Sequence, residues 1–301
     1  MRRIGVMLNL GADDRETKAR LAAFTRRLAG LGWREGKNVA FEYRWGMGDL
    51  DLHRQHAAEL ARLSPDVILA HGSFIVRPLL HATRKIPVVF VSVGDPVAGG
   101  FAGNLARPGG NATGFSSIEY ALSGKWLELL KQIAPKTSRV AVLRDPEQVS
   151  GGGQLGALEA VARVLGVELF PIDVREPKAM KAAIAAFAQQ PNGGLIATTT
   201  ALAQIHRAAI VGLATQYRLP AVYPYRLYIP DGGLVSYGPD ILLQYRLAAD
   251  YVDRILRGAN PGDLPIQQPN NYLLVVNLKA AKAIGLQIPE TVLGSADEVI
   301  E

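Results

Sequence analysis

Short apolar runs alternate with longer amphipathic stretches along the whole sequence of 301 residues. Runs such as "VILAHG" and "PVVFVSV" are nearly continuous in apolar residues, which is typical of strands buried on both faces. Because amphipathic stretches separate these runs, the pattern predicts an α/β protein with parallel sheets covered by helices. The predicted strands are Arg3–Leu10, Asn38–Trp45, Asp66–His71, Pro87–Val93, Thr113–Ser117, Arg139–Arg144, Glu168–Val174, Gly194–Thr199, Ala221–Tyr225 and Gly233–Tyr237.

The amphipathic stretches carry apolar residues at helical spacing. In "DDRETKARLAAFTRRLAGLG" this spacing puts Leu21, Phe24 and Leu28 on one face. In "LAADYVDRILRG" the same spacing puts Leu247, Tyr251 and Ile255 on one face. We interpret both faces as facing the core.

The two halves of the chain repeat the same order of strand and helix, with opening strands at Arg3 and Arg139. Two similar α/β units predict two Rossmann-like lobes, and small ligands tend to bind in a cleft between lobes. The remaining segment, "ANPGDLPIQQPNNYLLVVNLKAAKAIGLQIP", predicts a linker followed by a strand and a short helix.

Composition narrows the choice of function. The 33 basic and 27 acidic residues give a net charge of +6, but they are spread along the chain, which favours a solvated surface over a nucleic-acid patch. The absence of cysteine excludes disulfides and thiolate chemistry. No secretory signal precedes the first predicted strand, so we expect a protein that is either cytoplasmic or exported by a signal outside this sequence.

Common catalytic motifs are missing from the sequence. It contains neither a phosphate-binding G-x-x-x-x-G-K-[ST] loop nor a G-x-S-x-G nucleophile turn. His53 and His56 lie three residues apart on a charged helix whose outer face we expect in solvent, with Glu59 as the nearest third ligand. We therefore predict no metal site and no catalytic residue.

One stretch, "SGGGQLGALEAVARVLG", matches the dinucleotide fingerprint G-x-G-x-x-G at Gly151, Gly153 and Gly156. In a pyrophosphate loop the first glycine follows the strand almost at once, whereas here "PEQVS" intervenes. We interpret the glycines as a flexible connection, expect Gly166 to end the following helix, and predict no cofactor.

Several long phrases resemble one protein family. They include "VFVSVGDPVAGGFAGNLARPGGNATGFSS", "KWLELLKQIAPKTSRVAVL", "DGGLVSYGPD" and "RLAADYVDRILRGANPGDLPIQQPNNYLLVVNLKAAKAIGLQIP". From Arg3 to Glu301 the chain resembles the ABC transporter substrate-binding proteins related to tryptophan and tyrosine binders. The resemblance implies a type I periplasmic-binding-protein fold, in which two lobes joined by three crossing strands close on a ligand.

Mapped onto this sequence, the resemblance places the crossings near Thr113–Ser117, Ser236–Pro239 and Asn270–Leu273. Lobe one then comprises residues 1–114 plus 239–269, and lobe two comprises residues 115–238 plus 270–301.

The resemblance also implies a function. We expect a periplasmic or otherwise extracytoplasmic solute-binding protein, monomeric and without enzymatic activity, that delivers its ligand to an ABC permease in the membrane. The expected ligand is a small polar or zwitterionic molecule, with an aromatic amino acid as the leading candidate. The alternatives are a cytoplasmic ligand-sensing core and a nucleotide-dependent enzyme using Gly151 to Gly156.

In such a fold, loops at the carboxyl ends of strands build the ligand site. In lobe one, Ser73 in "HGSF" either receives a ligand carboxylate at a helix start or only caps that helix. Asp95 in "GDP" either binds an ammonium group or only stabilises a turn.

In lobe two, Tyr223, Tyr225 and Tyr237 either stack on a flat ligand or pack in the core. The predicted ligand-binding residues are Asn9, Leu10, His71, Gly72, Ser73, Phe74, Asp95, Ser116, Thr199, Thr200, Tyr223, Tyr225, Tyr237 and Asp240.

Overall fold

The computed structural model describes residues 1–117 and 120–301, apart from the side chain of Val149. The chain forms two compact units. Unit 1 comprises Met1–Ile118 and Asp240–Pro269, and unit 2 comprises Glu119–Pro239 and Asn270–Glu301. The chain therefore passes from one unit to the other after residues 118, 239 and 269.

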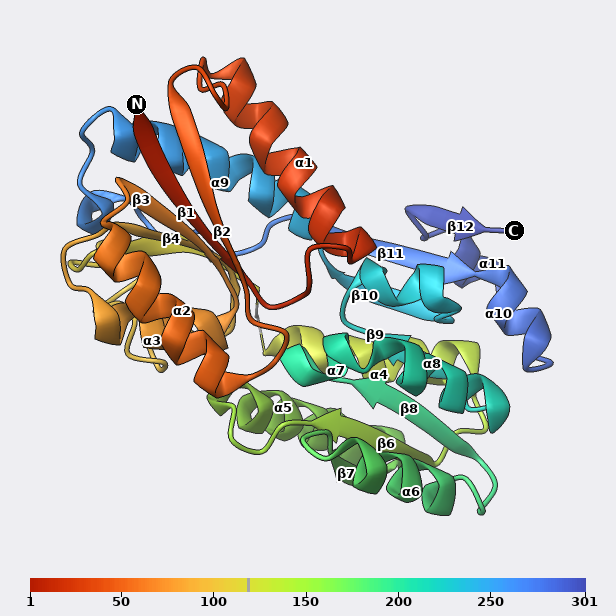
Figure 1. Cartoon of the computed structure of the whole chain (residues 1–301). Coiled ribbons are helices and arrows are strands. Elements are labelled where there is room, and N and C mark those ends of the chain that lie inside the picture. The colour runs from red at the N-terminus through yellow and green to blue at the C-terminus, as the bar shows by residue number, and fades with distance from the viewer. Residues whose placement is uncertain (118–119) are drawn as a thin grey trace. The chain divides into compact units, whose positions relative to one another are not determined.

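Unit 1 is built on a five-stranded sheet in the order β2-β1-β3-β4-β5, and every neighbouring pair is parallel. Helices α1 and α9 pack together on one face, and α2 and α3 pack together on the other (Figure 1). The elements are β1 (Arg2–Leu8), α1 (Arg15–Gly30), β2 (Val39–Trp45), α2 (Leu50–Leu63), β3 (Val67–His71), α3 (Ser73–Ala82), β4 (Val88–Val93), β5 (Ala112–Ser116), α9 (Ile241–Leu256) and the 3-10 turn η2 (Pro261–Asp263).

The helices of unit 1 bury most of the expected residues, although Leu21 of α1 is only half-buried. In α1, Phe24 and Leu28 are buried, as predicted. In α9, Tyr251 is buried, but Leu247 is 38% exposed, so its predicted place in the core is wrong. The buried stripe of α9 instead passes through Tyr245, with Ala248 and Val252 further along the same face, and this stripe turns Leu247 outward.

Unit 2 is built on a seven-stranded sheet in the order β12-β11-β10-β9-β8-β6-β7. Its neighbouring strands are parallel except β10 and β11. The chain leaves unit 2 at the end of β10 and returns into β11, so these two strands run in opposite directions. The strands are β6 (Arg139–Arg144), β7 (Glu168–Asp173), β8 (Gly193–Ala197), β9 (Ala221–Tyr223), β10 (Val235–Pro239), β11 (Tyr272–Asn277) and β12 (Glu298–Ile300).

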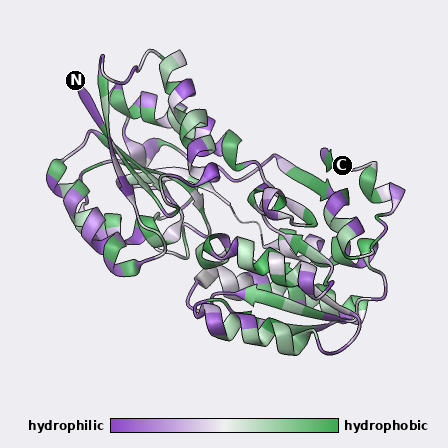
Figure 2. Ribbon diagram, turned by 45° about the vertical axis from the view of Figure 1, so that its right-hand side comes forward, coloured by the Kyte–Doolittle hydropathy of each residue, from purple (hydrophilic) through white to green (hydrophobic). Residues whose placement is uncertain are grey.

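Helices cover the sheet of unit 2, and its central strands are strongly hydrophobic (Figure 2). Trp126 of α4 is fully buried there, and its Nε1 donates to the backbone carbonyl of Tyr237 at 2.7 Å. The helical elements are α4 (Ala121–Ile133), α5 (Val149–Leu165), α6 (Pro177–Phe187), α7 (Ala201–Ile205), α8 (Arg207–Gln216), η1 (Arg226–Asp231), α10 (Leu278–Ala283) and α11 (Glu290–Leu293).

Every strand predicted from the sequence is present, with its ends shifted by no more than about two residues, as expected for boundaries. The glycine run is different, because the predicted flexible connection is wrong and α5 already begins at Val149. A Cβ at Gly153 would lie 2.4 Å from the ring of Tyr120, and one at Gly151 would lie 2.7 Å from the backbone oxygen of Asp145. The glycines therefore let this helix approach its neighbours closely.

The end of α5 agrees with the prediction. Gly166 caps the helix with a φ of 64° in the left-handed region. This helical context, together with the residues that separate the glycines from β6, is unlike a pyrophosphate loop.

Candidate ligand-binding site

Four of the predicted ligand-binding residues lie at the carboxyl end of the sheet in unit 1, including Ser116, which the sequence had assigned to lobe two. Asn9 follows β1, His71 ends β3, Asp95 follows β4 and Ser116 ends β5. Because these strands are parallel neighbours, their ends share one edge. Asn9 and the adjacent Leu10 are buried, and the Oδ1 of Asn9 accepts a hydrogen bond from the backbone N–H of Gly48 at 3.1 Å, which connects the loops after β1 and β2.

His71 lies in a buried polar network. Its Nε2 is 3.2 Å from Nη1 of Arg20, and its Nδ1 is 3.1 Å from the hydroxyl of Tyr245. Because an arginine can only donate, Nε2 accepts and Nδ1 carries the proton. Burial, and then the charge of Arg20, hold the pKa of His71 well below its ordinary value. His71 is therefore neutral and held in a fixed orientation.

Arg20 brings a charge into this network. It is buried, and its Nε donates to Oε1 of Glu16 at 3.0 Å. This carboxylate compensates the positive charge of the buried guanidinium, which has little access to water.

Ser73 is the first residue of α3, and the N-cap residue is Gly72, with a φ of 85°. The capping role considered for Ser73 is wrong, because no side chain caps this helix. The Oγ of Ser73 instead accepts a hydrogen bond from the backbone N–H of Gly94 at 3.3 Å. It thereby ties the start of α3 to the loop after β4. Phe74, the next residue, is half-buried.

Asp95 stabilises its own turn. Its Oδ1 accepts hydrogen bonds from the backbone N–H groups of Val97 at 3.1 Å and Ala98 at 2.9 Å. This is the Asx turn that the sequence suggested as one alternative, and it fixes the direction of the carboxylate. Asp240 has a similar local role, because it is the N-cap of α9 and accepts from the N–H of Leu243 at 2.9 Å.

In unit 2 the predicted threonines follow β8. The N–H and the hydroxyl of Thr199 both donate to Oε1 of Gln154, at 3.3 and 3.2 Å. Thr200 caps α7 by accepting from the N–H of Leu202, and its Oγ1 also accepts from Nε2 of Gln148 at 3.4 Å. Helix α5 therefore holds the loop after β8 in place.

The three tyrosines differ in their surroundings. Tyr223 and Tyr225 are buried in unit 2, and the ring of Tyr223 stacks on Tyr228 with centroids 4.6 Å apart. Tyr223 and Tyr225 are therefore core residues, which is the second of the two roles that the sequence allowed for them. Tyr237 is half-buried, and its ring centroid lies 6.0 Å from that of Tyr272.

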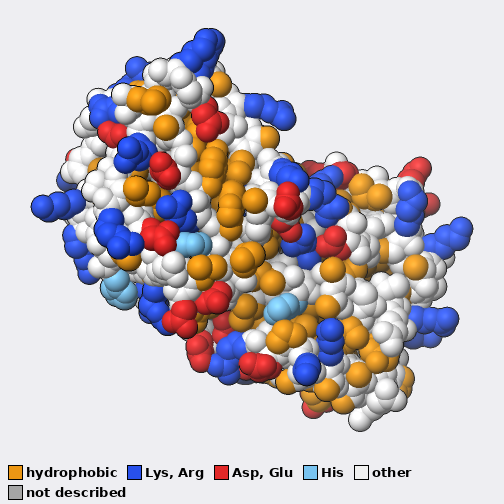
Figure 3. All heavy atoms as spheres, viewed as in Figure 1, with side chains coloured by type: hydrophobic (Ala, Val, Ile, Leu, Met, Phe, Trp, Pro, Cys, Tyr) orange, Lys and Arg blue, Asp and Glu red, His pale blue; other side chains and the backbone are white. Residues whose placement is uncertain are grey.

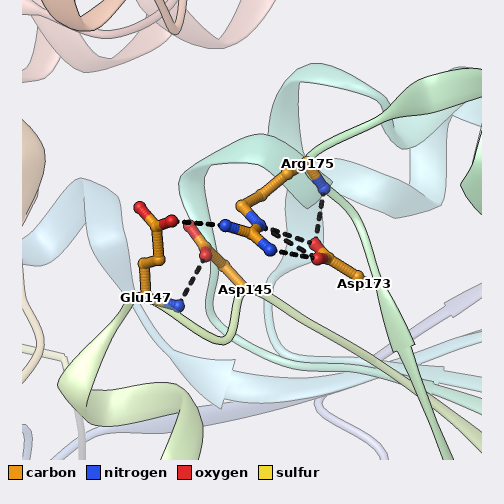
Figure 4. Close-up of polar contacts among 4 residues, drawn as sticks. All are labelled: Asp145, Glu147, Asp173 and Arg175. Atoms are coloured by element: carbon orange, nitrogen blue, oxygen red, sulfur yellow. Dashed lines mark hydrogen bonds and ion pairs between the residues drawn. The ribbon is translucent and has the colours of Figure 1, made fainter.

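Sequence reasoning missed a charged cluster at the carboxyl ends of β6 and β7 (Figure 4). Arg175 is paired with Glu147 and donates to Asp173, with a 2.7 Å bond from Nη2. Asp145 is only 1% exposed and accepts from the N–H of Glu147 at 3.0 Å, and burial raises its pKa. The available signal was its position directly after a predicted strand.

We expected His53 to lie on a solvent-facing helix surface. This expectation is wrong, because His53 is only 1% exposed. The reason is Gly46, where a Cβ would lie 2.1 Å from the imidazole ring. Burial lowers the pKa of His53 to about 4. Among the described residues, no group of His, Cys, Asp and Glu is arranged to hold a metal ion.

On the face shown in Figure 3, lysine and arginine alternate with acidic side chains, as the spread of charge along the sequence predicted. Across residues 1–117 and 120–301, no helix combines the length and apolar character needed to cross a membrane.

A comparison with protein families decides the relationship. The model of the ABC transporter substrate binding protein family matches residues 4–300. The chain belongs to this family. A curated relative is the tyrosine-binding protein of Clostridioides difficile strain R20291, which is 23% identical over 270 residues, covering 88% of this chain and 76% of the relative.

Solved structures share the fold of this chain. A conserved domain protein from Vibrio cholerae is 27% identical, with a TM-score of 0.91 and 99% of each chain covered. The ABC domain from Streptococcus pneumoniae in complex with L-Trp is 21% identical, with the same TM-score and coverage. The two sheets of mostly parallel strands are those of a type I periplasmic binding protein, as the sequence predicted.

Proposed function

We propose that this substrate-binding protein is the extracytoplasmic receptor of an ABC importer for an amino acid, with an aromatic amino acid as the first candidate. The family match over residues 4–300 carries the proposal. The tyrosine-binding relative and the L-Trp complex of a structural neighbour support the choice of ligand.

In this proposal the protein binds its ligand without chemical change. The ligand binds the closed state of the two lobes more tightly than the open state, and it therefore shifts the protein toward the closed state. The closed monomer then docks on the permease. A zwitterion needs one group for its ammonium and another for its carboxylate, and both groups must compete with water.

In unit 1, Asp95 is the proposed partner of the ligand ammonium, because its carboxylate is held in a fixed turn at the shared strand edge. The proposed carboxylate site is the start of α3, where the backbone N–H groups of Ser73 and Phe74 lie at the positive end of the helix. The other proposed ligand-binding residues are Asn9, Leu10, His71, Gly72, Ser116, Thr199, Thr200, Tyr237 and Asp240.

A thermal-shift screen of amino acids, followed by calorimetric titration, tests the function. L-Trp or L-Tyr is expected to raise the melting temperature by several degrees, because a ligand at 100 times its Kd stabilises the folded state by about 2.7 kcal/mol. The ligand should be recovered unchanged. No shift and no heat of binding with any amino acid would contradict the proposal.

The variant Asp95→Asn tests the ammonium site. Asparagine keeps the Oδ1 acceptor of the turn but removes the charge, so the fold should be retained while amino-acid affinity falls about tenfold or more. Asp51→Asn is the matched control, since Asp51 is an exposed residue of α2. Wild-type affinity in Asp95→Asn would assign the carboxylate to the turn alone.

A further inference from the structure

Gln244, in the second turn of α9, is a buried amide that joins two strand ends of unit 1. Its Oε1 accepts from the backbone N–H of Ser92 at 3.3 Å, and its Nε2 donates to the backbone carbonyl of Ser116 at 2.8 Å. Each backbone partner can play only one of the two roles, so the orientation of the amide is fixed.

Ser92 occupies an unusual backbone conformation. Its φ of 57° lies in the left-handed region, which residues other than glycine rarely adopt. It falls where the register between β4 and β5 shifts, between Phe90 and Val93. This irregularity is a bulge that directs the chain into Gly94 and Asp95, and its geometry needs support from neighbouring groups.

The bulge also connects the other parts of the proposed site. The carbonyl of Val91 accepts from the N–H of Gly72 at 2.9 Å, immediately before α3. The carbonyl of Val93 accepts from the N–H of Ser117 at 2.8 Å, and the N–H of Gly94 donates to Ser73. A change at the bulge would therefore displace the start of α3 and the loop that carries the proposed ammonium partner.

Gln244 also lies close to two chain crossings. Its acceptor Ser116 ends β5, shortly before the chain leaves unit 1 after residue 118. Gln244 itself comes one helical turn after Asp240, where the chain returns to unit 1. One side chain thus holds the bulge, the outgoing strand and the incoming helix together.

We propose that Gln244 is a positioning residue for ligand binding, which holds the bulge at Ser92 and thereby sets the place of Asp95 and of the start of α3. The ligand part of this inference rests on the proposed function. The competing explanation is that Gln244 only fills the core of unit 1 and contributes to its stability.

The first test replaces the amide by an apolar side chain of similar length. In Gln244→Met the N–H of Ser92 loses its acceptor, so hydrogen exchange at Ser92 should become about tenfold faster or more, without a similar change in the amides of β1. The Kd for L-Trp or L-Tyr, measured well below the melting temperature, should rise about tenfold. Gln189→Met, at an exposed position after α6, is the control and should change neither quantity.

A second variant keeps half of the interaction. In Gln244→Glu the carboxylate still accepts from Ser92 but cannot donate to Ser116. As the pH falls, the carboxyl takes up a proton, and its O–H can then donate to the carbonyl of Ser116. The ratio of variant to wild-type Kd should therefore fall toward one at acid pH for Gln244→Glu and stay constant for Gln244→Met.

The outcomes separate the two proposals. Wild-type exchange at Ser92 and wild-type Kd in Gln244→Met would overturn the positioning role, as would a ratio for Gln244→Glu that stays well above one at every pH. If the wild-type protein binds no amino acid, the ligand assignment fails. The exchange at Ser92, measured without ligand, then decides whether Gln244 holds the bulge.

Discussion

The absence of a side chain at Gly46 allows the imidazole of His53 to be buried, and this burial makes stability depend on pH. Burial, and secondarily the nearby His56, lower the pKa of His53 from 6.5 to about 4, against the opposing effect of Asp49. The unfolded chain therefore binds a proton more readily than the folded chain. Stability from this group is complete above pH 6.5 and is lost as the pH falls toward 4, with a loss of about 2 kcal/mol between pH 7.5 and pH 5.

The variant His53→Leu removes this titration and also removes two ring nitrogens that have no partner among the described residues. Urea unfolding across this pH range should show a smaller loss of stability on acidification than in the wild type. His81→Gln, at an exposed position, serves as the control and should keep the wild-type slope. Equal slopes in wild type and His53→Leu would contradict the assignment.

At the scale of elements, α5 contains glycines with opposite roles. Gly156 is exposed, and a Cβ at this position would have no atom within 4 Å, so Gly156→Ala should raise the free energy of unfolding by about 0.5–1 kcal/mol. At Gly153 a Cβ would meet the ring of Tyr120, and Gly153→Ala should lower the free energy of unfolding by about 1–3 kcal/mol. Urea unfolding measures both, and a gain in Gly153→Ala would show that Tyr120 moves aside without cost.

The same helix shows what sequence patterns can and cannot predict. Dense apolar runs predicted the strands correctly, and the ends of those strands predicted the positions of His71 and Asp95. Both predictions succeeded because an apolar run and a strand end can be recognised from neighbouring residues alone. The start of α5 was missed, since glycine is a poor helix former and its benefit comes from contact with Tyr120. Gln244 was missed for a similar reason, because its partner Ser92 lies 152 residues away in the sequence.

At the scale of the whole molecule, unit 1 is assembled from two distant segments. Helix α9, from the second segment, packs along α1, and its Tyr245 contacts His71 at the centre of the buried network. Asp253 of α9 accepts a 2.7 Å hydrogen bond from Nε1 of Trp33, and Asp250 is paired with Arg27. The first segment alone would expose the face of the sheet and of α1 that α9 covers.

We therefore expect residues 1–118 alone to show no cooperative thermal transition by circular dichroism. Joining them through a flexible linker to residues 240–269 should restore one, because α9 then buries its apolar stripe and provides the partners of His71 and Trp33. In this fusion, Tyr245→Ala should weaken the transition more than Leu247→Ala, since Tyr245 is buried and Leu247 is 38% exposed. A cooperative transition in residues 1–118 alone would show that α9 is dispensable for unit 1, and equal effects of the two alanine variants would show that the fusion does not dock α9 as it lies here.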